Sequence, residues 1–226
     1  MRRTEGLNEK TAESLHAAMS LGGDREALAR YYADWAATYD KDVGGDDYGL
    51  PGSVVFTLDA VATTKPHLAS TELAVLDAGC GTGMIGSALA ARGHKVIDGI
   101  DLSPEMTAVA ERLEHDGRPV YRQLAAPVDL TCPLPTHLVA SAPIVVIGGV
   151  FTVGHVPPET LRNVVELVAP GGLLVSTVRQ GYFDTTDYGA VSDGLVDAGR
   201  VEIVAQFDAL PYTEDSSGRF YAYRCL

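Results

Sequence analysis

The sequence is poor in basic residues and in cysteine. Lys and Arg number 17 against 30 Asp and Glu, which gives a formal net charge of −13. Nucleic acids and anionic membranes attract Lys and Arg, so we expect neither as a partner. The three cysteines, Cys80, Cys132 and Cys225, match no zinc spacing, and an odd number cannot all pair. This cysteine usage is typical of a reducing, cytoplasmic setting.

Long apolar stretches are also missing. The longest nearly apolar run, residues 138–153, contains a proline and two glycines, and it is shorter than the roughly 20 residues that a membrane helix needs. Residues 2–10 are polar, so no signal peptide is expected. His, Cys, Asp and Glu do not gather at metal-ligand spacing, so we expect no metal site.

The densest pattern in the chain is a glycine-rich turn. Apolar residues 73–76 are typical of a buried strand, and they are followed by Asp77 and then by Gly79, Gly81 and Gly83. Residues 84–91 are typical of a helix. A strand, a tight turn and a helix N-terminus present free backbone N–H groups to a ligand, and glycine lets that ligand approach closely. The pattern predicts a nucleotide-sized site.

Three ligands compete for this turn. A nucleoside triphosphate is excluded because the lysine of a P-loop is missing. A dinucleotide remains possible, because Gly81, Gly83 and Gly86 match G-x-G-x-x-G and Asp101 follows at the spacing of a ribose-binding acid. S-adenosylmethionine also fits, since it has no phosphate, and its sulfonium and ammonium groups favour an acid such as Asp77.

Strands and helices alternate after residue 70. We expect strands at 73–76, 95–100, 120–124, 144–147, 173–178, 201–207 and 220–225, and helices at 84–91, 103–115, 158–168 and 188–198. This alternation predicts an α/β fold with a doubly wound, mostly parallel sheet. Residues 1–63, with helices near 11–20, 25–38 and 52–63, are predicted to form a helical lid. Residues 64–226 are predicted to form the core, and the two parts one structural domain.

Six segments resemble motifs of the class I S-adenosylmethionine-dependent methyltransferases. They follow one another in the order of that family, and two of them, 32–40 and 151–156, resemble its small-molecule branch and its Williams–Beuren syndrome region methyltransferase-like group. The segments are 32–40, 75–83, 98–106, 129–131, 151–156 and 169–175. The resemblance covers roughly residues 30 to 226.

The resemblance implies a Rossmann-like, seven-stranded sheet whose last strand, near 218–225, is antiparallel. It implies S-adenosylmethionine as cofactor and S-adenosylhomocysteine as product. By position, Asp77, Gly79, Gly81 and Gly83 would hold the methionine end, and Asp101 the ribose. Leu102, Met106, Asp129 and Leu130 would surround the adenine, and Tyr39 would close over the cofactor.

His155 is the main candidate for a general base, because it follows the fourth strand at the carboxyl edge where such folds bind ligands. Tyr39 is a second catalytic candidate. Alternatively, His155 is a structural residue in the turn before two prolines. His94 lies in a helix-to-strand turn, where we expect it to be exposed. The expected substrate contacts lie on the lid or past the fourth and fifth strands: Trp35, Tyr48, Phe151, His155, Arg179 and Tyr182.

These observations favour a cytoplasmic enzyme, a monomer or homodimer, that methylates the oxygen or nitrogen of a small molecule. Two other enzymes remain open. One uses the cofactor's sulfonium charge for an isomerisation or cyclisation without methyl transfer, and the other is an NAD-dependent oxidoreductase. A non-catalytic interaction protein is the least favoured, because the residues of the glycine turn are intact.

Overall fold

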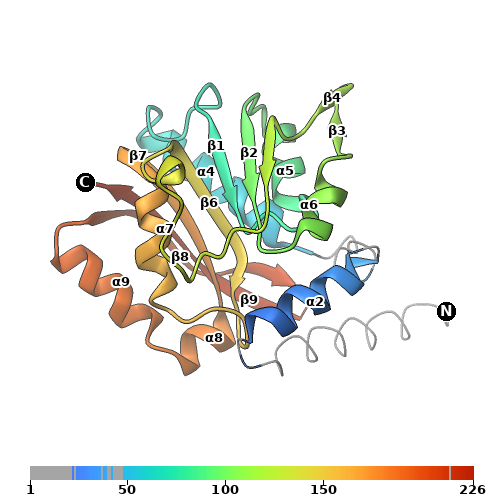
Figure 1. The fold of residues 1–226 in the computed structure, drawn as a ribbon. Coiled ribbons are helices and arrows are strands. Elements are labelled where there is room, and N and C mark those ends of the chain that lie inside the picture. Colours follow the sequence, from blue (N-terminus) through green and yellow to red (C-terminus); the bar gives the residue numbers. More distant parts are fainter. Residues whose placement is uncertain (1–21, 23, 37, 40–41, 43–47, 214) are drawn as a thin grey trace, which may run out of the picture.

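The computed structural model describes residues 22, 24–36, 38–39, 42, 48–213 and 215–226 (Figure 1). The predicted helix near residues 11–20 lies outside this range. Two helices precede the first strand in the described part: α2 (Arg25–Trp35) and α4 (Leu50–Thr64). Asp24 caps α2 because its side chain accepts a hydrogen bond from the Ala27 N–H.

The core is a seven-stranded sheet in the order β5-β2-β1-β6-β7-β9-β8. The strands from β5 to β7 are parallel, and β9 runs antiparallel to both of its neighbours. The expected Rossmann-like sheet with an antiparallel last strand is therefore confirmed. The bounds are β1 (Val75–Ala78), β2 (Ile97–Ile100), β5 (Gln123–Ala125), β6 (Ala142–Phe151), β7 (Val168–Arg179), β8 (Val201–Thr213) and β9 (Ser216–Cys225).

Helices cover both faces of the sheet (Figure 1). Successive residues of a strand face opposite sides, so Val75 packs with α4 and α5 while Leu76 packs with α7 and α9. Both faces of the central strands are therefore buried, as expected for a parallel sheet. The remaining bounds are α5 (Met84–Arg92), α6 (Pro104–Ala110), η1 (Thr136–Leu138), α7 (Thr160–Leu167), α8 (Gln180–Thr185) and α9 (Tyr188–Asp197).

Several predicted boundaries were wrong. Strand β7 begins at Val168 instead of residue 173, β8 ends at Thr213 instead of 207, and β9 begins at Ser216 instead of 220. The first strand starts two residues later than expected, at Val75. The helix from Ser103 ends at Ala110 instead of near His115, because a small hairpin, β3 (Glu114–His115) and β4 (Arg118–Pro119), follows it. Its two-residue turn, Asp116-Gly117, has positive φ at both positions, as Asp-Gly hairpins require. The third strand accordingly begins only at Gln123.

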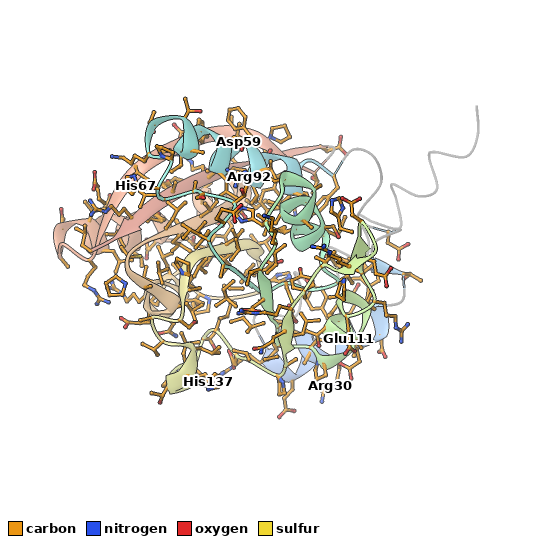
Figure 2. All side chains as sticks on the ribbon, turned by 90° about the horizontal axis from the view of Figure 1, so that it is seen from above. Arg30, Asp59, His67, Arg92, Glu111 and His137 are labelled. Carbon is orange, nitrogen blue, oxygen red and sulfur yellow. The ribbon has the colours of Figure 1, made fainter. Side chains whose placement is uncertain are left out.

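The environment of His94 was also predicted wrongly. Its side chain is buried, and its Nε2 accepts a hydrogen bond of 2.7 Å from Arg92. The Arg92 side chain also reaches Asp59 at 2.8 Å, and these two residues lie side by side in Figure 2. His94 therefore belongs to a structural network between α4 and α5.

The two described helices of the predicted lid take different places. Helix α4 packs against β8 and α5, on the sheet, whereas α2 contacts α6 and runs along the carboxyl ends of the parallel strands (Figure 1). In the described part of the chain, α2 is the helix placed to cover a ligand. The division of the chain at residue 63 stays a prediction.

Candidate active site

A cavity lies at the carboxyl edge of the sheet, between the loops that follow the strands and helix α2. It holds about 1060 Å³ of empty space when the solvent at its open mouth is included. The wall contains residues that follow β1, β2, β5 and the central part of β6, and it is closed on one side by Arg25, Leu28 and Tyr32 of α2.

Asp101 ties the glycine turn to the next loop. One of its carboxylate oxygens accepts a hydrogen bond from the Gly81 N–H, and the other accepts one from the Ser103 N–H, both at 2.8 Å. Burial raises the pKa of Asp101. Gly81 has φ +53°, and a Cβ at this position would meet no atom within 4 Å, so the turn leaves room for a ligand at this point.

Asp77 lies beneath the turn. It is fully buried and does not line the cavity. Its Oδ2 accepts a hydrogen bond of 2.8 Å from the Tyr121 hydroxyl, while its Oδ1 has no hydrogen-bond partner among the described residues. Burial raises the pKa of Asp77 to about 7, and the nearby Asp101 adds to this effect. An unpartnered buried carboxylate oxygen favours a cationic group nearby.

Tyr121 also explains the third glycine of the G-x-G-x-x-G match. A Cβ at Gly86 would lie 2.2 Å from the Tyr121 hydroxyl oxygen. Gly86 is therefore required by the packing of Tyr121 against helix α5. With Asp77 and Asp101 both next to the turn, the site is unfavourable for a pyrophosphate.

Asp129 sits at the mouth of the cavity in a set of hydrogen bonds. Its Oδ1 accepts from the backbone N–H of Thr131 at 2.9 Å and from the Thr131 hydroxyl at 2.6 Å. Its Oδ2 forms an ion pair with Arg25 and accepts from the Cys132 thiol at 3.4 Å. Burial acts to raise the pKa of Asp129, but the hydrogen bonds from Thr131 and Arg25 outweigh it, and the pKa lies below its ordinary value.

His155 and Tyr32 form a hydrogen-bonded pair on the cavity wall. His155 Nδ1 lies 3.2 Å from the carbonyl oxygen of Val153, which can only accept, so Nδ1 carries the proton and Nε2 accepts from the Tyr32 hydroxyl. Burial lowers the pKa of His155, and the charge of Arg179 lowers it further. Burial raises the pKa of Tyr32. The pair is therefore a neutral imidazole that receives a hydrogen bond from a neutral phenol.

Most of the predicted site residues meet at the cavity. Those that line it are Tyr39, Tyr48, Gly79, Gly81, Asp101, Leu102, Met106, Asp129, Leu130 and His155. Predicted residues outside its wall are Trp35, Asp77, Gly83, Phe151, Arg179 and Tyr182.

Three expected substrate contacts are buried outside the cavity wall. Phe151 is fully buried, packed edge-on against the ring of Tyr188, because it lies on the face of β6 that α7 and α9 cover. The Tyr182 hydroxyl donates to the carbonyl oxygen of Val156 at 2.7 Å, which holds the loop after β6. Trp35 is buried at the end of α2 and its Nε1 donates to Asp42 at 2.9 Å.

Three important residues were missed by the sequence analysis: Arg25, Tyr32 and Tyr121. The sequence analysis named Trp35 of this helix as a substrate contact, but Arg25, Leu28 and Tyr32 form the part of α2 that lines the cavity. The spacing of Leu28 and Tyr32 could have indicated this face. Nothing in the sequence pattern relates Tyr121 to Asp77, because their contact spans 44 residues.

Comparisons with known proteins agree with this geometry. Residues 76–174 match the family model of a methyltransferase domain. Human methyltransferase-like protein 27 is 32% identical over 149 residues, which are 66% of this chain and 56% of the human protein. These comparisons support a class I S-adenosylmethionine-dependent methyltransferase. The chain spans little more than half the length of that human relative.

Solved structures share the fold of this methyltransferase. Magnesium protoporphyrin IX methyltransferase from Synechocystis PCC 6803, with bound S-adenosylhomocysteine, has a TM-score of 0.64 at 16% identity, over 90% of this chain and 100% of that one. An S-adenosylmethionine-dependent methyltransferase from Leishmania major has a TM-score of 0.65 at 17% identity, over 88% and 82%. The narrower resemblance to the Williams–Beuren syndrome region group stays a prediction.

The cofactor of this family is S-adenosylmethionine, and the residues of the site fit it. The open space at Gly81 leaves room along the glycine turn, and Asp101 stands at the end of β2. The unpartnered Asp77 Oδ1 favours the cofactor's positive charge. No helix in the described ranges is long and apolar enough to cross a membrane.

Proposed function

We propose that this methyltransferase transfers a methyl group to an oxygen or nitrogen atom of a small molecule, with His155 as general base. The observation that carries the proposal is a neutral imidazole on the cavity wall whose Nε2 accepts a hydrogen bond from the Tyr32 hydroxyl. Supporting features are the enclosure of the cavity by α2 and the aromatic lining from Tyr39 and Tyr48. Trp35, which stacks on Tyr32, and Arg179, whose charge acts on His155, lie outside the cavity wall.

We assign the cofactor's adenine to Leu102, Met106, Asp129 and Leu130, and its ribose to Asp101. The methionine end is assigned to the glycine turn above Asp77, at Gly79, Gly81 and Gly83. Tyr39 closes over the cofactor. In this arrangement the acceptor occupies the part of the cavity near Tyr48 and His155.

The chain's own contribution to the reaction is alignment and proton transfer. S-adenosylmethionine supplies an electrophilic methyl group when bound, and the acceptor displaces its sulfur directly. Helix α2 and the aromatic side chains exclude water and orient the acceptor. The acceptor's proton passes to the Tyr32 hydroxyl oxygen as the Tyr32 proton passes to His155 Nε2, because the one lone pair of Nε2 already accepts from Tyr32 and Nδ1 is protonated and bonded to Val153.

The acidic net charge and the cavity are the basis for proposing a small molecule, not a nucleic acid, as the acceptor. We also propose that the enzyme acts in the cytoplasm, as a monomer or homodimer. The fold alone also permits chemistry without methyl transfer. Methylated product formed in equal amount with S-adenosylhomocysteine supports methyl transfer, whereas product without S-adenosylhomocysteine supports the isomerisation or cyclisation.

The test of the base is the variant His155→Gln. We expect kcat to fall by about 10²- to 10⁴-fold, as for loss of a general base, with little change in S-adenosylhomocysteine affinity. Because the His155 pKa lies below its ordinary value, wild-type kcat should fall only as the pH drops below about 6.5. The variant should lack that step.

A matched control is His137→Gln, since His137 is exposed at the periphery of the molecule (Figure 2). It should behave as the wild type. If His155→Gln keeps the wild-type kcat and its pH profile, His155 is a structural residue and the assignment of the base is wrong.

A further inference from the structure

Helix α2 is anchored to the core by polar contacts at two points on one face. Arg25 at its first turn contacts the loop after β5, through Asp129 and the Cys132 sulfur, the latter at 2.8 Å. Tyr32, seven residues later and therefore on the same face, contacts His155 in the loop after β6. Leu28 lies between them on the cavity wall. The helix thus bridges two loops across the opening.

The Arg25 anchor differs from an ordinary surface ion pair. Thr131 holds the Asp129 carboxylate with two hydrogen bonds to Oδ1, so Oδ2 is already oriented toward Arg25. Bonds from Thr131 and Arg25 together keep the pKa of Asp129 below its ordinary value despite burial, so the carboxylate stays charged at neutral pH. The acid is therefore pre-organised to receive the guanidinium.

The anchor stands at the end of the cavity that holds Leu102, Met106 and Val128, to which the proposed function assigns the adenine. A ligand lying there is covered by Arg25 and Leu28, and it can leave on this side only when α2 lifts from the loop after β5.

We propose that the Arg25–Asp129 ion pair is a latch that holds α2 over the adenine end of the cofactor site and limits the rate at which S-adenosylhomocysteine leaves. Arg25 is then a positioning residue that acts through α2. The inference rests on the cofactor placement of the proposed function.

The exposure of the pair sets the size of the effect. The side chains of Arg25 and Asp129 are 50% and 24% exposed, so solvent screens their attraction. Pairs of this kind contribute little, so we expect a change of about two- to fivefold in the dissociation rate constant. The Debye length shrinks to about 3 Å at 1 M salt, so the contribution of this ion pair to the dissociation rate should vanish at that salt concentration.

The experiment measures S-adenosylhomocysteine dissociation directly, without turnover. Trp35 is the only tryptophan of the chain. It is buried at the end of α2 with its ring 4.8 Å from that of Tyr39, which lines the cavity. Stopped-flow tryptophan fluorescence therefore follows the helix, and filter binding of radiolabelled S-adenosylhomocysteine gives an independent dissociation rate.

The variants are Arg25→Gln, Arg25→Lys and the control Arg30→Gln. Arg30 is on the same helix but 71% exposed at the periphery, paired with Glu26 (Figure 2). At low salt, Arg25→Gln should raise the dissociation rate about two- to fivefold, Arg25→Lys should recover part of the loss, and Arg30→Gln should match the wild type. At 1 M salt, all four proteins should release the ligand at the same rate.

Three results would overturn the latch. Two of them are an unchanged dissociation rate in Arg25→Gln at low salt and an equal rise in Arg30→Gln. A general weakening of α2 would raise the rate at both salt concentrations, which would also contradict an ionic latch. A wild-type protein that binds no S-adenosylhomocysteine would instead contradict the cofactor assignment, so the two failures are distinguishable.

Discussion

Asp77 is a carboxylate in an environment very different from that of a free amino acid. It is fully buried, one of its oxygens accepts from Tyr121, and the other has no hydrogen-bond partner in the described part of the chain. Burial of a carboxylate disfavours its charged form, so Asp77 gains a proton in the free protein near neutral pH. The acid that begins the glycine turn is therefore also a local source of instability.

This environment predicts a pH dependence of folding. Because the pKa rises from 3.8 to about 7 on folding, the folded state binds more protons than the unfolded state between these values. The free energy of unfolding should therefore fall as the pH rises from about 4 to about 7, by up to about 4 kcal/mol from this group. Urea unfolding of the wild type and of Asp77→Asn across this pH range measures how the free energy of unfolding of each protein depends on pH. If the two proteins show the same pH dependence, the prediction is wrong.

Asp101 gives a second prediction, at the level of binding. Its carboxylate orders the glycine turn through Gly81 and the next loop through Ser103. The variant Asp101→Ala should weaken S-adenosylhomocysteine binding by about 1.5–3 kcal/mol, as expected for lost hydrogen bonds to a charged group. The control is Asp98→Ala on the same strand, whose carboxylate pairs with Arg122 outside the cavity. Calorimetry that shows equal affinities for the two variants would exclude the ribose assignment.

Among the elements, helix α5 shows how a binding motif and a packing contact can share one residue. Gly86 completes the sequence pattern of a dinucleotide site, yet it is required because Tyr121 occupies the place of its side chain. In contrast, Gly194 in the interior of α9 has open space where a Cβ would stand. Side-chain packing therefore requires glycine at position 86, whereas no packing contact requires it at position 194.

Alanine at these two positions should have opposite effects. Gly86→Ala should destabilise the protein by about 1–3 kcal/mol, because the ring of Tyr121 must move and its bond to Asp77 is strained. Gly194→Ala should stabilise it by about 0.5–1 kcal/mol through helix propensity. Urea unfolding of both variants tests this, and a stabilised Gly86→Ala protein would show that Tyr121 moves freely.

The sequence predicted elements best where apolar periodicity was strong. The strand at 144–147 and the helix at 84–91 were confirmed, since both carry long apolar runs. The helix after Ser103 was predicted to reach residue 115, but residues 114–115 form a strand that leads into the hairpin turn Asp116-Gly117. Trp35 of α2 was predicted to contact the substrate but is buried outside the cavity wall, because the face that a helix turns to a site is decided by what the helix packs against.

For the whole molecule, the order of motifs predicted both the sheet and most of the cavity wall. The remaining features depend on contacts between distant segments, such as Tyr121 with Asp77, Arg25 with Asp129 and Tyr32 with His155. No periodicity encodes these pairs. They follow only from the way the sheet brings its carboxyl ends and α2 together.

Ligand binding should stabilise the molecule as a unit. At a concentration of 100 times its Kd, S-adenosylhomocysteine adds about 2.7 kcal/mol to the free energy of unfolding. For a chain of this size, this corresponds to a rise of about 5–11 °C in the midpoint of thermal unfolding. NADH should give no rise, since two carboxylates adjoin the glycine turn. Differential scanning calorimetry with each ligand measures the midpoint of unfolding. Stabilisation by NADH alone would indicate that the site binds a dinucleotide.

The position of β9 has a consequence for synthesis on the ribosome. Strand β8 comes earlier in the chain, but in the sheet its one neighbour is β9, which separates it from β7. During translation the chain leaves the ribosome N-terminus first, at about 5–20 residues per second. Residues 201–213 therefore have no strand to form hydrogen bonds with until residues 216–225 have been released. A translational pause or a proteolytic cut in that interval leaves the edges of β7 and β8 that β9 would pair with unpaired, and unpaired strand edges promote aggregation.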